Sequence, residues 1–246
     1  MTRKRIIGLM AILLSASMVA GTAHGQSEAD IRERIKAATK GFKDLQMDTK
    51  IAYSNEKELA KIGKDFGQAY KFKNSRLSFK APDKFKMSAK AGFMNVSYIV
   101  TSDIKKIRAG VINKTENIAK EPHKRQTILD AGLVNDSLWD FYTVERIHDE
   151  TYNGKPVLLI QLSLSNSPDK KQYVWVNPKD YRMLVREKKE ADGSLIVRYI
   201  YSGHKEFAGV WVPSEVRAYN ENSKLAGTSL YRNIRVNKGI SDDEFK

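Results

Sequence analysis

The side chains that could carry out catalysis or bind a metal are few and scattered in this sequence of 246 residues. Outside the first 25 residues the histidines are His123, His148 and His204. None has a second histidine four residues away, the spacing with which one helix face binds zinc. The chain contains no cysteine, which excludes disulfides, a thiol nucleophile and thiolate metal ligands. We therefore expect neither a metal site nor another cofactor.

Serine and lysine pairs give the remaining catalytic hypothesis. The pattern S-x-x-K places a lysine beside a serine nucleophile in β-lactamase-like enzymes, but its companion motifs S-D-N and K-T-G are missing here. It occurs at Ser54/Lys57, Ser102/Lys105 and Ser202/Lys205. A lysine-rich chain produces such matches by chance. We predict that the protein is not an enzyme, with an uncharacterised hydrolase as the catalytic alternative.

A group of carboxylates also lies close together in the sequence. It consists of Asp136, Asp140, Glu145 and Asp149. Nothing in the sequence around them indicates a buried acid–base pair, so solvation explains them better than catalysis does.

The first 25 residues have the three parts of a secretory signal peptide. A basic segment at residues 2–5 precedes an uncharged, mostly apolar stretch at residues 6–20. Ala23 and Gly25 then place small residues at positions −3 and −1 of a cut after Gly25. The apolar stretch is shorter than the roughly 20 residues of a membrane span. We expect residues 1–25 to be removed and the chain to be periplasmic, without a lipid anchor because it has no cysteine.

The chain is strongly basic, with a formal net charge of +14 that falls to +11 once the leader's three basic residues are removed. A basic exported protein can meet anionic lipid, lipopolysaccharide or nucleic acid. The lysines are spread along the chain and do not form one block interleaved with aromatics. We interpret the charge as a solvated surface and expect no nucleic-acid partner.

Strand patterns dominate the chain after an amphipathic helix predicted over residues 27–42. Residues 84–90 give the clearest two-faced strand, with Phe85 and Met87 opposite a row of lysines. Asn153-Gly154 predicts a hairpin turn. We expect a polar loop over residues 113–125, a short helix over residues 127–139, and an antiparallel meander after residue 142, whose strands include residues 210–219. The predicted class is α+β, mainly β: a curved antiparallel sheet covered by short helices.

Several of these strands carry a continuous face of large apolar side chains. Two short helices do not cover so much apolar surface, so long loops fill the remainder or a cavity is left. The candidate ligand-binding residues of such a cavity are Phe79, Phe85, Met87, Leu158, Ile160, Leu162, Val197, Tyr199 and Tyr201.

Five sequence phrases, in this order, resemble the LolA/LolB-like superfamily of outer-membrane lipoprotein-sorting proteins. They are Phe-Lys-Ala-Pro-Asp-Lys-Phe-Lys-Met at 79–87, Asn-Gly-Lys-Pro at 153–156, Tyr-Val-Trp-Val-Asn-Pro-Lys at 173–179, Gly-Val-Trp-Val-Pro at 209–213 and the segment 231–240. The resemblance implies an incomplete antiparallel β-barrel, a half-barrel closed by helices, whose inner face takes up acyl chains. One departure is Ala81, which stands where the family has an arginine that helps to hold the lid shut.

The function implied by the resemblance is that of a periplasmic chaperone for lipoproteins or other lipids. Such a carrier is a monomer that receives its cargo from an inner-membrane exporter, delivers it to an outer-membrane receptor and touches the membrane only transiently. We therefore expect residues 26–246 to form a single LolA-like lipid-binding domain. The alternative is a periplasmic regulator of the same fold that senses lipid or binds an anti-sigma factor. Such regulators carry a second C-terminal domain, for which we expect no room after the last predicted strand.

The signal peptide gives the first testable prediction. Because small residues precede the bond after Gly25, N-terminal sequencing of periplasmic material should begin at Gln26. Recovery of the chain from the membrane fraction with Met1 retained would contradict it.

Overall fold

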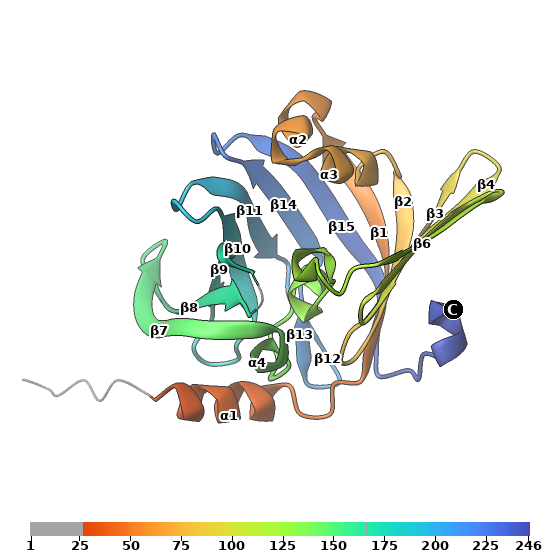
Figure 1. Ribbon diagram of the computed structural model, residues 1–246. Helices are drawn as coiled ribbons and strands as arrows, with labels where there is room; N and C mark the ends of the chain where they lie inside the picture. Colours follow the sequence, from red (N-terminus) through yellow and green to blue (C-terminus); the bar gives the residue numbers. More distant parts are fainter. Residues whose placement is uncertain (1–26, 166) are drawn as a thin grey trace, which may run out of the picture.

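The computed structural model describes residues 27–165 and 167–246, and the leader predicted over residues 1–25 lies outside these described residues (Figure 1). The α-helices are α1 (Glu28–Ala38), α2 (Glu56–Ile62), α3 (Lys64–Ala69) and α4 (Leu138–Phe141). The 3-10 helices are η1 (Pro122–Lys124), η2 (Ile128–Ala131) and η3 (Asp242–Phe245). In the part of the chain that is described, no helix is long and apolar enough to cross a membrane.

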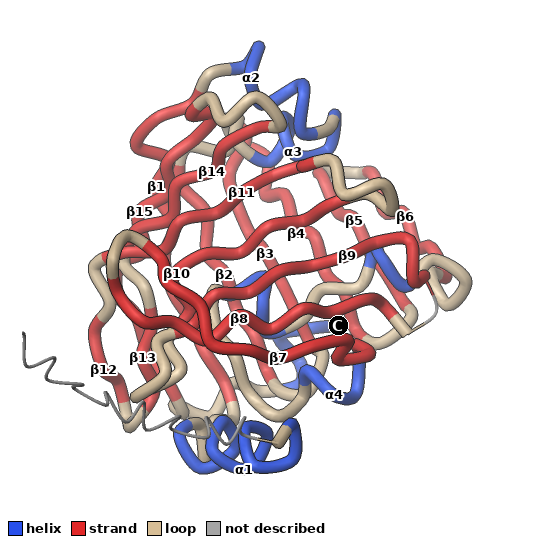
Figure 2. The backbone as a smooth tube through the Cα atoms, turned by 90° about the vertical axis from the view of Figure 1, so that its left-hand side faces the viewer, coloured by secondary structure: helices blue, strands red, loops and turns tan. Residues whose placement is uncertain are grey.

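One antiparallel sheet of 13 strands forms the body of the protein, in the order β6-β5-β4-β3-β2-β1-β15-β14-β11-β10-β9-β8-β7. Its strands are β1 (Asp44–Ser54), β2 (Asn74–Lys80), β3 (Lys84–Ala91), β4 (Met94–Thr101), β5 (Ile104–Ala109), β6 (Ile112–Asn117), β7 (Tyr142–Tyr152), β8 (Lys155–Leu164), β9 (Ser167–Val176), β10 (Met183–Lys189), β11 (Leu195–Ser202), β14 (Glu215–Asn220) and β15 (Leu225–Val236). A two-stranded sheet pairs β12 (Lys205–Phe207) with β13 (Val210–Val212). The large sheet curves strongly around a hollow (Figure 2). Because β6 and β7 form its free edges, the sheet is an incomplete barrel, as predicted.

The alternation in the sequence decides which face of each strand turns inward. In β1, Leu45 and Met47 are fully buried on the concave side, whereas Asp48 lies on the outer side beside Arg76 of β2. The predicted Asn153-Gly154 turn joins β7 and β8, with both residues at positive φ (50° and 72°). Local sequence therefore fixes both the strand faces and this hairpin.

Three predicted elements differ from the structure. The short helix expected over residues 127–139 was wrong, because the chain forms only η2 and α4 there. The expectation of a polar loop over residues 113–125 was wrong for its first part, because β6 extends from Ile112 to Asn117. This strand lies at the sheet edge with both faces largely exposed, so it lacks an apolar alternation. The strand expected over residues 210–219 is split into β13 and β14 around Pro213, which has no N–H for a ladder hydrogen bond.

Helices close the two ends of the curved sheet (Figure 1). At one end α1 buries Ile31 and Ile35 in the main apolar cluster. At the other end α2 and the α3–β2 connection contribute Leu59 and Tyr70 to a smaller cluster. The Tyr70 ring lies against the backbone of Gly227, where a Cβ would stand only 2.1 Å from it. A glycine is therefore needed at that point of β15.

A substitution at Ile160 tests the assignment of the side chains of β8 that face the core. Ile160→Ala should lower the free energy of unfolding by about 2–5 kcal/mol, because the side chain is fully enclosed in the main cluster. Urea unfolding measures this loss. The matched change Thr143→Ala on the neighbouring β7, at an exposed position, should alter stability by less than about 0.5 kcal/mol. Equal losses in the free energy of unfolding for the two substitutions would contradict the assignment of Ile160 to the buried face.

Candidate functional site

The concave face of the sheet brings the predicted ligand-binding residues into one apolar wall. Phe79, Phe85, Leu158, Ile160, Leu162 and Tyr201 are buried in the main cluster, and Met87 and Tyr199 pack against it partly buried. Val197 is buried but lies outside this cluster. The wall therefore combines side chains from both halves of the sheet, from β2 and β3 to β8 and β11.

The connection between the two free edges of the sheet, residues 118–141, enters this hollow, and we call it the plug. Figure 1 shows its central turn inside the curve of the sheet. The plug contains the short helices η1, η2 and α4, which are joined by hydrogen-bonded turns. Its side chains in the main cluster are Ile118, Ile128, Leu129, Ala131, Leu133, Val134 and Leu138. Of the two alternatives that the sequence left open, this structure shows the packed one, in which a long connection fills the concave face.

The contact between plug and wall is close. Gly132, just after η2, has a left-handed conformation with φ of +81°. A Cβ at this position would stand 3.0 Å from the Tyr201 ring and 3.0 Å from Pro213. The glycine thus permits both the tight turn and the approach of the plug backbone to the wall.

A buried ion pair joins the plug to the wall. The guanidinium of Arg186 on β10 is only 1% exposed, and its Nη1 donates to Oδ1 of Asp130 on the plug at 2.9 Å. Lys188, two residues further along β10, places its Nζ 3.6 Å from the same oxygen. Since a lone buried charge is strongly unfavourable, Asp130 and Arg186 each require the other in this position.

Neutral side chains complete the hydrogen bonding around the ion pair. Arg186 Nε donates to Oε1 of Gln172 at 2.6 Å, and Gln172 Nε2 donates to the Tyr142 hydroxyl at 3.1 Å. The same hydroxyl lies 3.2 Å from Oγ1 of Thr127, while the Thr127 N–H donates to Asp130 at 2.9 Å. We call this set of five residues, Thr127, Asp130, Tyr142, Gln172 and Arg186, the latch. It fixes the plug through directional bonds within an apolar surrounding.

The electrostatics of the latch keep both partners charged. Burial alone would raise the pKa of Asp130, but the charges of Arg186 and Lys188 and the bond from Thr127 outweigh it and leave that pKa lowered. Burial would lower the pKa of Arg186, and the Asp130 carboxylate reverses this and raises it. For Lys188, burial and the repulsion from Arg186 prevail and lower its pKa to about 8. The pair Asp130–Arg186 is therefore the stable ionic element.

Sequence reasoning missed the latch. At the family's lid-arginine position, Ala81 only packs against the main cluster, and the neighbouring Lys80 reaches the C-terminal segment at Asp242. The arginine that holds the plug comes from β10 instead. The available signal was a lone arginine whose cross-strand neighbours, Val174 and Tyr199, are apolar.

The residues considered for catalysis are not assembled into a site. In each S-x-x-K match the serine hydroxyl bonds to a residue other than the motif lysine: Ser54 to Lys73, Ser102 to Asp83 and Ser202 to Glu215. Glu145 forms an ion pair with Lys171 across the sheet. Among the described residues, no group of three or more histidines and carboxylates lies close enough to hold a metal ion.

Solved structures share this architecture. The chain is similar to a domain described as outer membrane lipoprotein-sorting from Vibrio parahaemolyticus, with a TM-score of 0.57 and 15% identity over 88% of this chain and 95% of that one. A LolA superfamily protein from Nitrosomonas europaea gives a TM-score of 0.61 and 11% identity over 89% and 96%. A DUF1329 family protein from Desulfovibrio piger gives 0.50 and 14% over 88% and 95%. The curved sheet is thus the fold of the LolA superfamily.

The family can be stated from the sequence as well. A family model described as an uncharacterized protein matches residues 99–246, more than half of the chain, and the chain belongs to that family. No curated protein matches it.

The latch predicts a characteristic double-mutant cycle. Asp130→Leu should lower the free energy of unfolding by about 3–5 kcal/mol, because it leaves Arg186 charged and buried. Arg186→Met should cost less, because Lys188 remains 3.6 Å from the Asp130 carboxylate. The double variant should regain most of the loss, since an apolar pair of similar volume is tolerated in such positions. Chemical denaturation of the four proteins measures the coupling, and additive losses would show that the two side chains do not act as a pair.

The same cycle has a pH dependence. The lowered pKa of Asp130 contributes stability above the unfolded-state value of about 3.9, and this stability is lost as the pH falls through the folded-state value. The coupling energy should therefore be full at pH 6 and shrink on acidification. A coupling that stays constant down to about pH 2 would contradict the assignment.

Proposed function

We propose that the protein is a periplasmic carrier that takes up acyl chains of lipoproteins or other lipids in the hollow now occupied by the plug. The observation that carries this proposal is the concave wall, which presents large apolar side chains from both halves of an open sheet to a segment that has only short helical turns. A core built only for stability needs no such segment. A removable plug, in contrast, keeps the wall covered until a ligand replaces it.

Magnitudes indicate what kind of ligand can replace the plug. Each buried methylene contributes about 0.8 kcal/mol, so ten of them in one chain contribute about 8 kcal/mol before ordering losses. Withdrawing even the η2 side chains Ile128 and Leu129 costs about 3–6 kcal/mol, and the latch adds to this. The binding of one acyl chain therefore gives little net free energy once the plug has been withdrawn. Two or three chains on one molecule give a clear net gain, and we infer a preference for multiply acylated ligands.

The protein needs no chemistry for this task. Binding and release depend on the plug, and residues 26–246 would act as one lipid-binding domain after removal of the leader. The partners are then an inner-membrane exporter that loads the hollow and an outer-membrane receptor that empties it. A lipid-sensing regulator of the same fold is the second candidate, and the latch serves it equally well, because plug displacement would change the surface offered to a protein partner.

Displacement of a fluorescent fatty acid tests the proposal. The native protein should bind the probe weakly, and a di-acylated peptide should compete at least about tenfold better than a single free fatty acid, because its second chain pays for opening the hollow. Binding of both should increase in the double variant Asp130→Leu/Arg186→Met, whose plug lacks the ion pair with the wall. Binding is followed by fluorescence on protein that unfolds cooperatively, since partly unfolded states also bind such probes.

The matched control is Lys80→Met, which removes an ion pair of similar length on the outer side of the sheet. It should leave acyl binding unchanged. If folded wild-type protein and the double variant both fail to bind any acyl ligand, the plug is a permanent part of the core and the carrier function is wrong.

A further inference from the structure

Two hairpin turns that project from the body carry apolar side chains into solvent. Phe93 and Met94 lie at the β3–β4 turn, and Val111 and Ile112 lie at the β5–β6 turn, Phe93 and Val111 being fully exposed. The turns are neighbours, because the Met94 Sδ stands 3.1 Å from where a side chain on Gly110 would begin. Figure 1 shows both hairpins extending away from the sheet. We call these four residues the tip.

The tip is exceptional on this protein's surface. Among the described residues, five large apolar side chains are exposed, and four of them form the tip; the fifth is Tyr53. Exposed apolar side chains that gather in one place indicate contact with another apolar phase.

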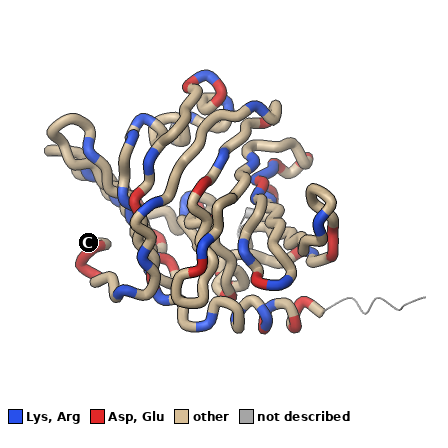
Figure 3. Tube along the Cα trace, turned by 180° about the vertical axis from the view of Figure 1, so that it is seen from behind, with Lys and Arg blue, Asp and Glu red and all other residues tan. Residues whose placement is uncertain are grey.

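The outer face of the same hairpins is cationic. Register places Lys84, Lys86, Lys90, Lys106 and Arg108 on this face. The one acidic residue between residues 84 and 114, Asp103, lies at the opposite end of the hairpins. Cross-strand register sets Arg232, Asp48, Arg76, Ser88, Ser97 and Arg108 in one row over five neighbouring strands and β15. Figure 3 shows lysines and arginines along these hairpins.

The acidic groups near this face are already used. Asp48 pairs with Arg76, and in η3 Asp242 pairs with both Lys80 and Lys84. These two lysines lower the pKa of Asp242 to about 2. Elsewhere on this face positive charge is in excess: within the described residues, Lys50, Lys90, Arg108 and Arg232 have no acidic partner.

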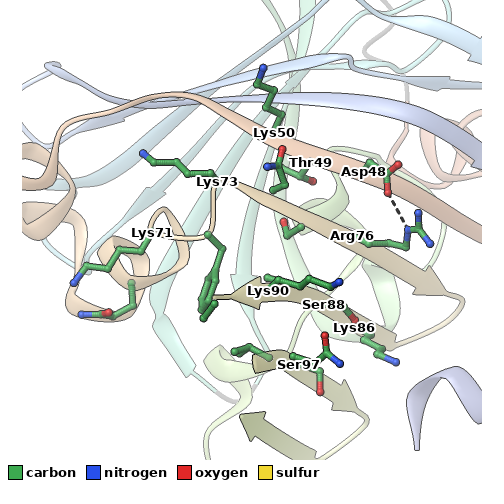
Figure 4. A pocket seen from close by; sticks show the side chains of 18 of the residues that line it. Asp48, Thr49, Lys50, Lys71, Lys73, Arg76, Lys86, Ser88, Lys90 and Ser97 are labelled. Carbon is green, nitrogen blue, oxygen red and sulfur yellow. Dashed lines mark hydrogen bonds and ion pairs between the residues drawn. The ribbon is translucent and has the colours of Figure 1, made fainter. Parts of the chain in front are cut away.

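A groove of about 1230 Å³ runs over this cationic face and ends beside the β3–β4 turn (Figure 4). Lys50, Arg76 and Lys90 line it together with the backbone of the β3–β4 turn at Gly92. Ser88 and Ser97 follow Arg76 in the cross-strand row that ends at Arg108, and both line the groove (Figure 4). The carboxylates that also line the groove, Asp48 and Glu244, are paired with Arg76 and Lys86. Lys50, Lys90 and the serine hydroxyls therefore remain for phosphate oxygens.

We propose that the tip and the adjoining cationic face dock on the surface of an anionic phospholipid bilayer. Phe93, Met94, Val111 and Ile112 enter the boundary between headgroups and acyl chains, and Lys90 and Arg108 lie at the level of the lipid phosphates. An apolar tip with flanking cations has the two components of interfacial binding, apolar burial and attraction to anionic lipid. This surface lies outside the hollow, and the inference does not depend on acyl binding there.

A single-cysteine label locates the contact, because the chain itself has no cysteine. An environment-sensitive fluorophore on Phe93→Cys or Val111→Cys should show a blue shift with vesicles of phosphatidylethanolamine and phosphatidylglycerol. The same fluorophore on Tyr53→Cys, an exposed apolar position outside the tip, should show none.

Vesicle co-sedimentation of unlabelled variants measures the two components separately. Phe93→Ser/Val111→Ser should reduce the partition coefficient at least about tenfold. Lys90→Gln and Arg108→Gln should each reduce it about fivefold, and Lys224→Gln, remote from this face, should not change it. Pure phosphatidylcholine vesicles should bind the wild type weakly, and high salt should release the protein from anionic vesicles.

Because all these positions are exposed, melting temperatures and acyl-probe binding should stay at wild-type values, which separates this inference from the carrier function. Wild-type protein that stays in the supernatant with anionic vesicles would overturn it. So would tip variants that bind as well as the wild type. A concentration-dependent dimer that is lost in Phe93→Ser/Val111→Ser, without vesicle binding, would instead assign the tip to a second copy of the chain.

Discussion

A charge cannot be left unpaired inside an apolar interior, and the Arg186 guanidinium lies in such an interior with 1% exposure. Its ionic partner, Asp130, belongs to the plug, the connection between the two free edges of the sheet. When the plug is displaced, the Arg186 guanidinium must bind water, another anion or a polar group of the ligand. This constraint sets the position of η2, brings Gly132 against Tyr201, and keeps the concave wall covered.

The same constraint connects structure to the proposed function. Apolar packing alone would hold the plug without a preferred register, whereas the latch specifies one arrangement through bonds from β7, β9 and β10. A ligand with several acyl chains can replace the apolar contacts of the plug, and an anionic headgroup could replace Asp130 beside Arg186 and Lys188. In the two proposals, the hollow takes up apolar cargo and the cationic tip brings the protein to the membrane from which cargo comes.

Local patterns were sufficient to predict much of this fold. The alternation of Phe85 and Met87 with lysines identified β3, and Asn153-Gly154 identified a hairpin, because both signals arise from adjacent residues. The buried leucines of residues 127–139 were also predicted, but as a helix: the structure has only η2 and α4, since the plug follows the shape of the hollow and not a helical period. The polar edge strand β6 had no apolar alternation from which to predict it.

The latch and the tip could not be predicted because each depends on distant contacts. Asp130 and Arg186 are 56 residues apart, and their pairing follows from strand order and from the path of the plug. In the sequence nothing distinguishes Phe93 and Val111 from the apolar residues of ordinary strands. Only the projection of the two hairpins beyond the body leaves them in solvent.

Hydrogen exchange of the plug during ligand binding tests the central claim most directly. Amides of residues 128–134 would be compared with those of β8, residues 157–164, with and without a di-acylated peptide. We predict that the peptide accelerates exchange in the plug and leaves β8 protected, because the acyl chains displace η2 from an intact wall. If the peptide binds while the plug amides keep or increase their protection, the ligand occupies another place and the plug is not a gate.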